Sequence, residues 1–295
     1  MGLIRIKTRR DRSVVSSAPF VVAEGRAVEV RVETLEILCS PREHVPLALE
    51  TRPPRNGDAT EFLVNREHGL EFPIRDGIPI FVDQQAISGL NGRFRRIYDS
   101  WAPFYDLLSR VGLAILGVSE QKLRRDFVDR LEIRNGSHVL STSVGTGSDL
   151  SFIPRGCKFY GNDLSAGMLR VCQSRVHRLG MLAELFLGEA EHLPFRDETF
   201  DVVYQMGGIN FFSDQAQAIR EMVRVAKKGT RIVIMDETEK VAKTLENVPG
   251  INAWFRHHRR PIVPPVEYVP PGMEDIETRE LYDGQAWLIS FRKPH

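Results

Sequence analysis

The chain has 295 residues, of which 42% are hydrophobic and 27% charged, and its formal net charge is +1. This length allows one large domain and a small one, and the near-neutral charge gives no electrostatic case for binding nucleic acid. The three cysteines, Cys39, Cys157 and Cys172, form no regularly spaced framework, so we expect a reducing, cytoplasmic location and no disulfide scaffold. No apolar run approaches the ~20 residues that a membrane span requires.

The first part of the chain predicts a tail and a small β-rich module. Residues 1–27 are basic and lack a continuous apolar stretch, which favours a flexible tail over a secretory signal and leaves a transit peptide as a weaker alternative. Residues 28–84 contain the alternating segment VEVRVETLEIL, which predicts a strand, and turn signals at His68-Gly69 and Asp76-Gly77, which predict a hairpin and one further strand.

The rest of the chain changes from a helical pattern to alternating strands and helices. Residues 85–133 predict helices, with an interruption at Pro103 and an N-cap at Ser119. In residues 134–295 the short apolar segments SHVLSTS, CKFYGND, AELFLGEA, FDVVYQM and TRIVIMDE alternate with helical stretches, and GQAWLISFRK adds a final strand. Such alternation predicts an α/β fold with a parallel sheet and helices on both of its faces.

Ligands of an open α/β sheet bind at the carboxyl ends of the strands, so the residues that follow each strand are the candidates for a site. The first strand is followed by a loop with Gly145 and Gly147, and Asp163 ends the next strand 16 residues later. This spacing spans one helix and one strand, and it places a carboxylate where it can accept hydrogen bonds from both hydroxyls of a ribose.

Four segments in this order, GTG, GNDLSAGML, GEAEHLPFRDETFDVV and REMVRVAKKGTRIVI, resemble the class I S-adenosyl-L-methionine (SAM)-dependent methyltransferases, and among them the menaquinone/ubiquinone-biosynthesis (UbiE-like) type. The resemblance extends from about Tyr98 to about Glu239. It implies a Rossmann-like, mostly parallel seven-stranded sheet in residues 134–295, a cap of residues 85–133 and SAM as the cofactor.

The resemblance also implies roles for single residues. The loop residues would contact the methionine and ribose parts of SAM, Asp163 the ribose hydroxyls, and Leu164 and Met168 the adenine. Glu189 and Ala190 would lie at the adenine edge, and Gln205 at the methionine end. The segment IYDSWAPFYDLL matches a helix that covers the cofactor in the family. The cofactor-binding residues so implied are Tyr98, Tyr105, Ser143, Val144, Gly145, Thr146, Gly147, Asp163, Leu164, Met168, Glu189, Ala190 and Gln205.

Two serines depart from the family pattern in the glycine loop. The family reads V-L-D-V-G-C-G-T-G where this chain reads V-L-S-T-S-V-G-T-G, so that Ser141 stands in place of a carboxylate and Ser143 in place of a glycine. A lost charged contact with the ammonium group of SAM would weaken binding by ~1–3 kcal/mol. Asp149 and Asp99 are candidates to replace the missing acid.

The small module resembles the zinc-ribbon module named after the Trm112 methyltransferase activator, in LEILCSP and LEFPIRDGIPIFVD. The family carries C-x-x-C twice, whereas this chain has Cys39, Arg42, Asn65 and His68 at those positions. A structural zinc site needs four good ligands, so we expect a module that holds no metal, even with His44 considered.

The sequence leaves the acceptor and the reaction open. Candidates for a catalytic base are His257, His258 and Glu237, although a solvated surface for the histidines and a helix cap for the glutamate are competing interpretations. A methyltransferase for a small-molecule quinol, phenol or other natural product is the leading hypothesis, with carbon, oxygen or nitrogen as the methylated atom. The alternatives are an enzyme of this fold that no longer methylates, for instance a cyclase of secondary metabolism, and a non-catalytic SAM-binding partner protein. The oligomeric state cannot be read from the sequence.

Overall fold

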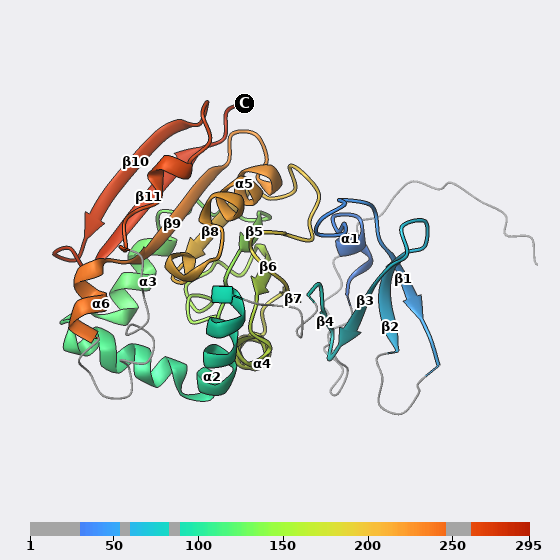
Figure 1. Ribbon diagram of the computed structural model, residues 1–295, viewed down its shortest axis with the longest axis horizontal. Coiled ribbons are helices and arrows are strands. Elements are labelled where there is room, and N and C mark those ends of the chain that lie inside the picture. Colours follow the sequence, from blue (N-terminus) through green and yellow to red (C-terminus); the bar gives the residue numbers. More distant parts are fainter. Residues whose placement is uncertain (1–29, 54–59, 83–88, 246–260) are drawn as a thin grey trace, which may run out of the picture.

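The computed structural model describes residues 30–53, 60–82, 89–245 and 261–295 (Figure 1). Within these ranges the chain forms a four-stranded sheet and a seven-stranded sheet. The helices are α1 (Val32–Leu35), α2 (Gly89–Ile115), α3 (Glu120–Val128), α4 (Ala166–Leu179), α5 (Gln215–Val225) and α6 (Glu239–Leu245), with 3-10 turns η1 (Ile209–Phe211) and η2 (Val266–Tyr268). The strands are β1 (Ala48–Thr51), β2 (Glu61–Asn65), β3 (Leu70–Arg75), β4 (Ile78–Pro79), β5 (His138–Ser141), β6 (Lys158–Asp163), β7 (Ala183–Leu187), β8 (Val202–Met206), β9 (Arg231–Glu237), β10 (Glu274–Leu281) and β11 (Ala286–Arg292).

The large sheet has the strand order β10-β11-β9-β8-β5-β6-β7. Its strands β7, β6, β5, β8 and β9 are parallel, whereas β11 runs antiparallel to β9 and β10 antiparallel to β11. The chain moves outward from β5 to β7 and then returns to the other side of β5 with β8. Because the strand order reverses at β5, the carboxyl ends of β5, β6 and β8 border the crevice where ligands bind in such sheets. The predicted α/β fold is confirmed.

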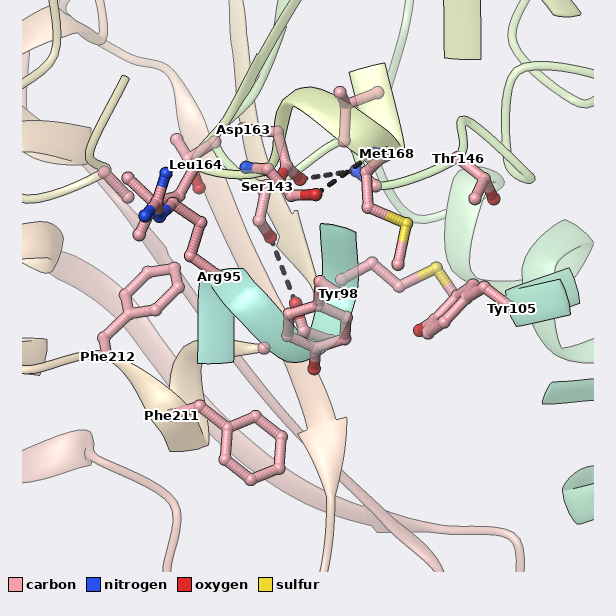
Figure 2. Close-up of a pocket in the computed structure, with 18 of the residues that line it drawn as sticks. Arg95, Tyr98, Tyr105, Ser143, Thr146, Asp163, Leu164, Met168, Phe211 and Phe212 are labelled. Carbon is pink, nitrogen blue, oxygen red and sulfur yellow. Dashed lines mark hydrogen bonds between the residues drawn. The ribbon is translucent and has the colours of Figure 1, made fainter. Parts of the chain in front are cut away.

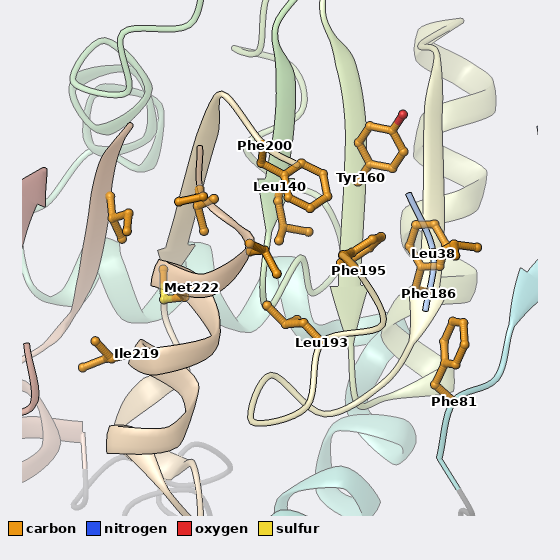
Figure 3. Packing of buried hydrophobic residues seen from close by; sticks show 14 of the residues in the cluster. Leu38, Phe81, Leu140, Tyr160, Phe186, Leu193, Phe195, Phe200, Ile219 and Met222 are labelled. Atoms are coloured by element: carbon orange, nitrogen blue, oxygen red, sulfur yellow. The ribbon is translucent and has the colours of Figure 1, made fainter. Parts of the chain in front are cut away.

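Side chains that alternate along the strands fill two separate cores, one on each face of this sheet. On β5, for example, Val139 belongs to the core beneath α3 and α4, and its neighbour Leu140 to the core beneath α5. Figure 3 shows the second core, in which Leu140 and Tyr160 of the strands lie with Ile219 and Met222 of α5. Both faces of the strands are buried, as parallel sheets require.

The small four-stranded sheet is attached to the edge strand β7. Ile80 forms a parallel bridge with Leu187, and the Phe81 N–H donates to the Leu187 carbonyl at 2.8 Å. Glu184 on β7, which is 4% exposed, accepts hydrogen bonds from Arg31 Nε and Thr34 Oγ1. These contacts extend the core beneath α5 into the small sheet, as the ring of Phe81 in Figure 3 illustrates.

The sequence predictions for the small sheet are partly confirmed. The turns at His68-Gly69 and Asp76-Gly77 join β2 to β3 and β3 to β4. The strand predicted in VEVRVETLEIL is wrong, because residues 32–35 form the short helix α1. The buried residues of this segment, Val30, Thr34 and Leu38, recur every four residues and not every second one, since Val32 between them is 79% exposed. The side chains of Arg31 and Thr34 bind Glu184.

The helices before the large sheet agree with their predicted positions. Ser119 is the N-cap of α3, and its side chain accepts from the Lys122 N–H. Pro103 does not end α2, which continues from Gly89 to Ile115; Figure 1 shows the ribbon changing direction within it, as a proline inside a helix causes. None of the helices in the described ranges combines the length and the hydropathy that crossing a bilayer demands.

Candidate functional site

The glycine loop follows β5 and is shaped by two residues with positive φ. Gly145 has φ +55° and Gly147 has φ +70°, a region in which side chains other than glycine are strained. A Cβ atom on Gly147 would also lie 2.6 Å from Leu150 Cδ1 and 2.7 Å from Cys172 Sγ. Gly147 therefore lets the loop pack against α4, whereas nothing fills the space beside Gly145.

Asp163 ends β6 directly opposite this loop. Its Oδ2 accepts from the Gly145 N–H at 2.7 Å, and its Oδ1 accepts from the Ser165 N–H at 2.9 Å. Burial raises the pKa of Asp163 to about 6, although both hydrogen bonds oppose that shift. The carboxylate is thus held in place by backbone groups and is ionised at neutral pH.

The loop, Asp163 and α2 enclose a cavity of about 910 Å³ that is partly open to solvent (Figure 2). In Figure 2 the rings of Tyr98 and Tyr105 reach toward it from α2, with Met168 and Thr146 on the opposite side. The lining residues are Asn91, Arg95, Tyr98, Tyr105, Arg124, Thr142, Ser143, Val144, Gly145, Thr146, Ser148, Asp163, Leu164, Ser165, Met168, Gly188, Ala190, Glu191, Met206, Gly207, Gly208, Phe211 and Phe212.

Most of the residues that the resemblance assigns to the cofactor border this one cavity. They are Tyr98, Tyr105, Ser143, Val144, Gly145, Thr146, Asp163, Leu164, Met168 and Ala190. Gly147, Glu189 and Gln205 are not part of the lining. The Glu189 carboxylate accepts from Asn91 Nδ2 at 3.3 Å and lies 3.7 Å from Arg42 of the small module.

Gln205 lies behind the glycine loop and binds it. Its Nε2 donates to Ser143 Oγ at 3.0 Å and to the Gly207 carbonyl, and Ser143 Oγ donates to the same carbonyl at 3.0 Å. Gln205 is fully buried, and its Oε1 has no hydrogen-bond partner within the described residues. Ser143 and Gln205 therefore join the ends of β5 and β8, and they leave one buried acceptor beside the loop.

The two acids proposed to replace the carboxylate at Ser141 have partners of their own. Asp149 accepts from the Tyr204 hydroxyl, which also interacts with Ser141. Asp99 accepts from Ser165 Oγ at 2.6 Å and from the Gly167 N–H at 2.9 Å. Neither acid lines the cavity, so neither is placed to replace the carboxylate that the family has at the position of Ser141.

Helix α2 is fixed over the cavity by polar contacts to α4 and the glycine loop. Besides Asp99, Asp106 accepts from Thr146 Oγ1 at 2.6 Å and from Ser148 Oγ at 3.0 Å. Arg175 of α4 forms an ion pair with Asp106, and together with these hydrogen bonds it keeps the pKa of that carboxyl below its usual value despite burial.

Several residues of the cavity were not identified from the sequence. Glu191 is buried and accepts from Asn91 Nδ2 at 3.1 Å and from the Ser213 N–H at 3.2 Å, while burial raises its pKa. Arg95 and Arg124 come from α2 and α3. Phe211 and Phe212 also line the cavity, and in Figure 2 the ring of Phe212 lies toward Arg95 and that of Phe211 toward Tyr98.

A second cavity of about 690 Å³ adjoins the first and shares four lining residues with it, Tyr105, Arg124, Met206 and Gly207. Its other lining residues are Ser109, Leu113, Leu116, Val118, Leu123, Met235, Asp236, Glu237, Val241, Tyr282, Gln285 and Ala286. Burial and the adjacent Glu237 raise the pKa of Asp236 well above its usual value. Of the predicted bases, Glu237 therefore faces this cavity, and His257 and His258 lie outside the described residues.

Residues 140–234 match a family model described as a methyltransferase domain. The chain is 37% identical to a demethylmenaquinone methyltransferase of Thermobifida fusca, over 52% of this chain and 65% of that protein. It is 30% identical to a demethylmenaquinone methyltransferase of Listeria welshimeri, over 56% of this chain and 70% of that protein. The chain spans 58–65% of the length of three such relatives.

A solved structure of a Methanococcus maripaludis protein described as SAM-dependent methyltransferase superposes with a TM-score of 0.50. The alignment covers 67% of this chain and 94% of that one at 16% identity, which shows the fold alone. Together with the strand order and the glycine loop, the sequence relatives establish that the chain belongs to the class I SAM-dependent methyltransferases of the menaquinone/ubiquinone-biosynthesis type.

Proposed function

We propose that the protein transfers a methyl group from SAM to a small-molecule acceptor, such as a quinol or phenol, at the junction of the two cavities. One observation carries the proposal. Asp163 stands at the wall of the first cavity, with its carboxylate fixed by the N–H groups of Gly145 and Ser165. A carboxylate in this position accepts hydrogen bonds from the two hydroxyls of a ribose.

The residues present fit SAM. Leu164 and Met168 provide apolar contacts beside Asp163 for the adenine. Gln205 Oε1 is a buried acceptor without a described partner, and a buried polar atom of this kind is costly unless a ligand or water satisfies it. Gln205 stands behind the loop and outside the cavity lining, so we expect it to support the loop at the methionine end rather than to contact SAM directly. Tyr98 and Tyr105 would cover the cofactor from α2.

SAM supplies the activated methyl group, bound to a positively charged sulfur. The protein then has to hold the acceptor in line with the methyl–sulfur bond, and such orientation supplies several kcal/mol of the rate enhancement. The wall shared by the two cavities, with Tyr105, Met206 and Gly207, is where the acceptor and the methyl group would meet. Glu237, next to Asp236 in the lining of the second cavity, would accept the proton that a phenol, enol or quinol carbon releases.

The second cavity favours an apolar ring with hydroxyl groups as the acceptor. Its wall contains apolar side chains such as Leu113, Leu123 and Val241, and its charged groups are Arg124 and the acid pair. The relatives named above are demethylmenaquinone methyltransferases, whose acceptor by name is demethylmenaquinone. We extend this acceptor class to the present chain and expect neither nucleic acid nor protein as the methylated partner, in a cytoplasmic enzyme.

A second candidate is an enzyme that binds SAM without transferring its methyl group. The observation that favours it is the glycine loop, where Ser141 is turned to Tyr204 and Ser143 to Gly207, so that no carboxylate of the loop reaches the methionine end. SAM would then be held mainly through Asp163 and have a structural role.

Calorimetric titration with SAM and S-adenosylhomocysteine tests the cofactor assignment. We expect binding by the wild type and a loss of about 10- to 150-fold in affinity for Asp163→Ala, because hydrogen bonds to a charged group are removed. Equal affinities of both proteins would refute the assignment. Incubation with SAM labelled in its methyl group and a panel of quinols, phenols and amines then separates the two candidates, since only a methyltransferase labels an acceptor.

A further inference from the structure

Helix α2 carries a row of exposed apolar side chains on the face opposite the cavities. The residues recur at intervals of three and four, which places them on one face of the helix, and over 14 residues they extend for about 21 Å. We call this row the outer face of α2; it consists of Trp101, Phe104, Leu107, Val111 and Ile115, which are 36%, 59%, 62%, 43% and 51% exposed. Figure 1 shows α2 along the rim of the molecule.

The opposite side of the same helix already performs the internal packing. Tyr98 and Tyr105 line the first cavity, and Ser109, Leu113 and Leu116 line the second. Helix α2 thus has apolar side chains on two opposite sides, of which only the side toward the cavities packs against the described chain. The outer face therefore has no function in the packing of the described chain, and exposed rows of this kind mark binding surfaces.

The charges around the outer face favour an anionic partner. Arg96 and Arg110 are exposed and lie on one flank of the row. Asp99 and Asp106 of the same helix are turned to α4 and the glycine loop. Arg110 is 3.1 Å from Glu120, but Arg124 binds the same carboxylate, so that one acid serves two guanidinium groups. This flank thus has a positive charge beside an apolar face.

The size of the outer face argues against a second copy of the chain as the partner. Five partly exposed side chains present on the order of 500 Å², whereas a standard protein–protein interface buries about 800 Å² on each partner. A helix with Trp, Phe and Leu on one face and arginines beside it has the composition of helices that lie in the surface of a bilayer.

We propose that the outer face of α2 docks the protein onto the surface of an anionic lipid bilayer, and that a lipid-soluble acceptor passes from there to the second cavity. The docking itself rests only on α2. The passage of the acceptor rests on the proposed function. Helix α2 carries the outer face on one side and lines both cavities with the other, so docking would bring the cavities to within about one helix diameter of the lipid surface.

Co-sedimentation of the full chain with vesicles tests the docking, without SAM or acceptor. The probes are vesicles of phosphatidylglycerol mixed with phosphatidylcholine, and vesicles of phosphatidylcholine alone. We expect binding to the mixed vesicles, weakened by salt, and a loss on the order of tenfold to a hundredfold for Phe104→Glu/Leu107→Glu, because two apolar side chains no longer enter the lipid. The matched control is Ile276→Glu, an equally apolar and 50% exposed position on β10, which should bind as the wild type does.

Thermal melting and SAM titration of the same variants complete the test. Unchanged melting with lost vesicle binding supports the proposal. If the double variant melts at a lower temperature and the wild type does not bind vesicles, another segment of this chain covers the outer face. If the wild type is a dimer in sedimentation velocity and the double variant is a monomer, a second copy covers it. Either result overturns the proposal. Binding that does not require phosphatidylglycerol, or that the double variant retains, overturns it too. Because SAM titration proceeds without vesicles, a failure of the proposed function remains distinguishable.

Discussion

The glycine loop and the small sheet both depart from the family patterns they resemble, but the consequence for ligand binding differs between them. In the loop, Ser143 bonds to Gly207 and Gln205, while Gly145 still presents its N–H to Asp163. In the small sheet, Asn65 Nδ2 donates to the Pro46 carbonyl at 2.9 Å, and Asn65 Oδ1 accepts from the His68 N–H at 3.0 Å. In both places hydrogen bonds occupy the substituted positions.

The difference lies in what each pattern uses to hold its ligand. A glycine loop acts mainly through its backbone, by N–H groups and by conformations that only glycine adopts readily. A zinc site acts only through side chains that bind the metal. Side-chain substitutions in the glycine loop can therefore leave its cavity in place, whereas each substitution at a zinc-pattern position of the small sheet removes a side chain that would bind the metal.

The largest effect is expected from adding a methyl group to the loop at Gly147. Gly147→Ala should lower the free energy of unfolding by about 2–4 kcal/mol, because the new Cβ overlaps Leu150 and Cys172 and φ is positive. Urea denaturation measures it. Gly145→Ala is the control, since its Cβ meets no atom; it should lose only about 1 kcal/mol from its positive φ. Equal losses would contradict the distinction between packing and conformation.

The next effect is a pH dependence of SAM binding. The pKa of Asp163 is about 6, and the ribose hydroxyls donate to its ionised form, so affinity should be constant above pH 6 and fall roughly tenfold per pH unit below it. The sign for folding is opposite: the folded protein binds this proton more tightly than the unfolded chain, so stability from this group decreases as pH rises from about 4 to 6. Titrations between pH 5 and 8 check the first statement, with Asp163→Asn as a control whose weaker binding lacks this dependence.

The sequence predicted the large sheet and the centre of the site because both depend on local patterns. Buried strands have continuous apolar runs, and the loop and Asp163 are close in sequence. Strand β10 escaped prediction because its segment EDIETREL is largely exposed and has almost no apolar residues. Asn91 and Glu191 are 100 residues apart in the sequence, so no local pattern connects them. Arg124 forms an i,i+4 ion pair with Glu120, which in the sequence is typical of a solvent-exposed helix and does not indicate a cavity.

A smaller effect should distinguish the two sets of replacement hydrogen bonds. Ser143→Gly and Asn65→Ala should each lower stability by about 0.5–1.5 kcal/mol, the contribution of a typical hydrogen bond. Both variants should bind SAM with an affinity within about threefold of that of the wild type. The reason is that Ser143 Oγ is directed to Gly207 and Gln205, and that Asn65 is remote in the small sheet. A marked rise in affinity for Ser143→Gly would show instead that the serine obstructs the cofactor.

The smallest effect is expected from removing metal ions. Cys39 is the only cysteine at the four positions of the zinc pattern, and it is fully buried, which raises the pKa of its thiol to about 11. Arg42 is a cation near Glu189, and Asn65 is already engaged by Pro46 and His68. A chelator should therefore leave the melting temperature within about 1 °C, since metal binding would otherwise contribute to folding. A clear fall on chelation, or zinc found in a one-to-one ratio with the purified protein, would contradict this, and it would require ligands other than the four positions that the pattern indicates.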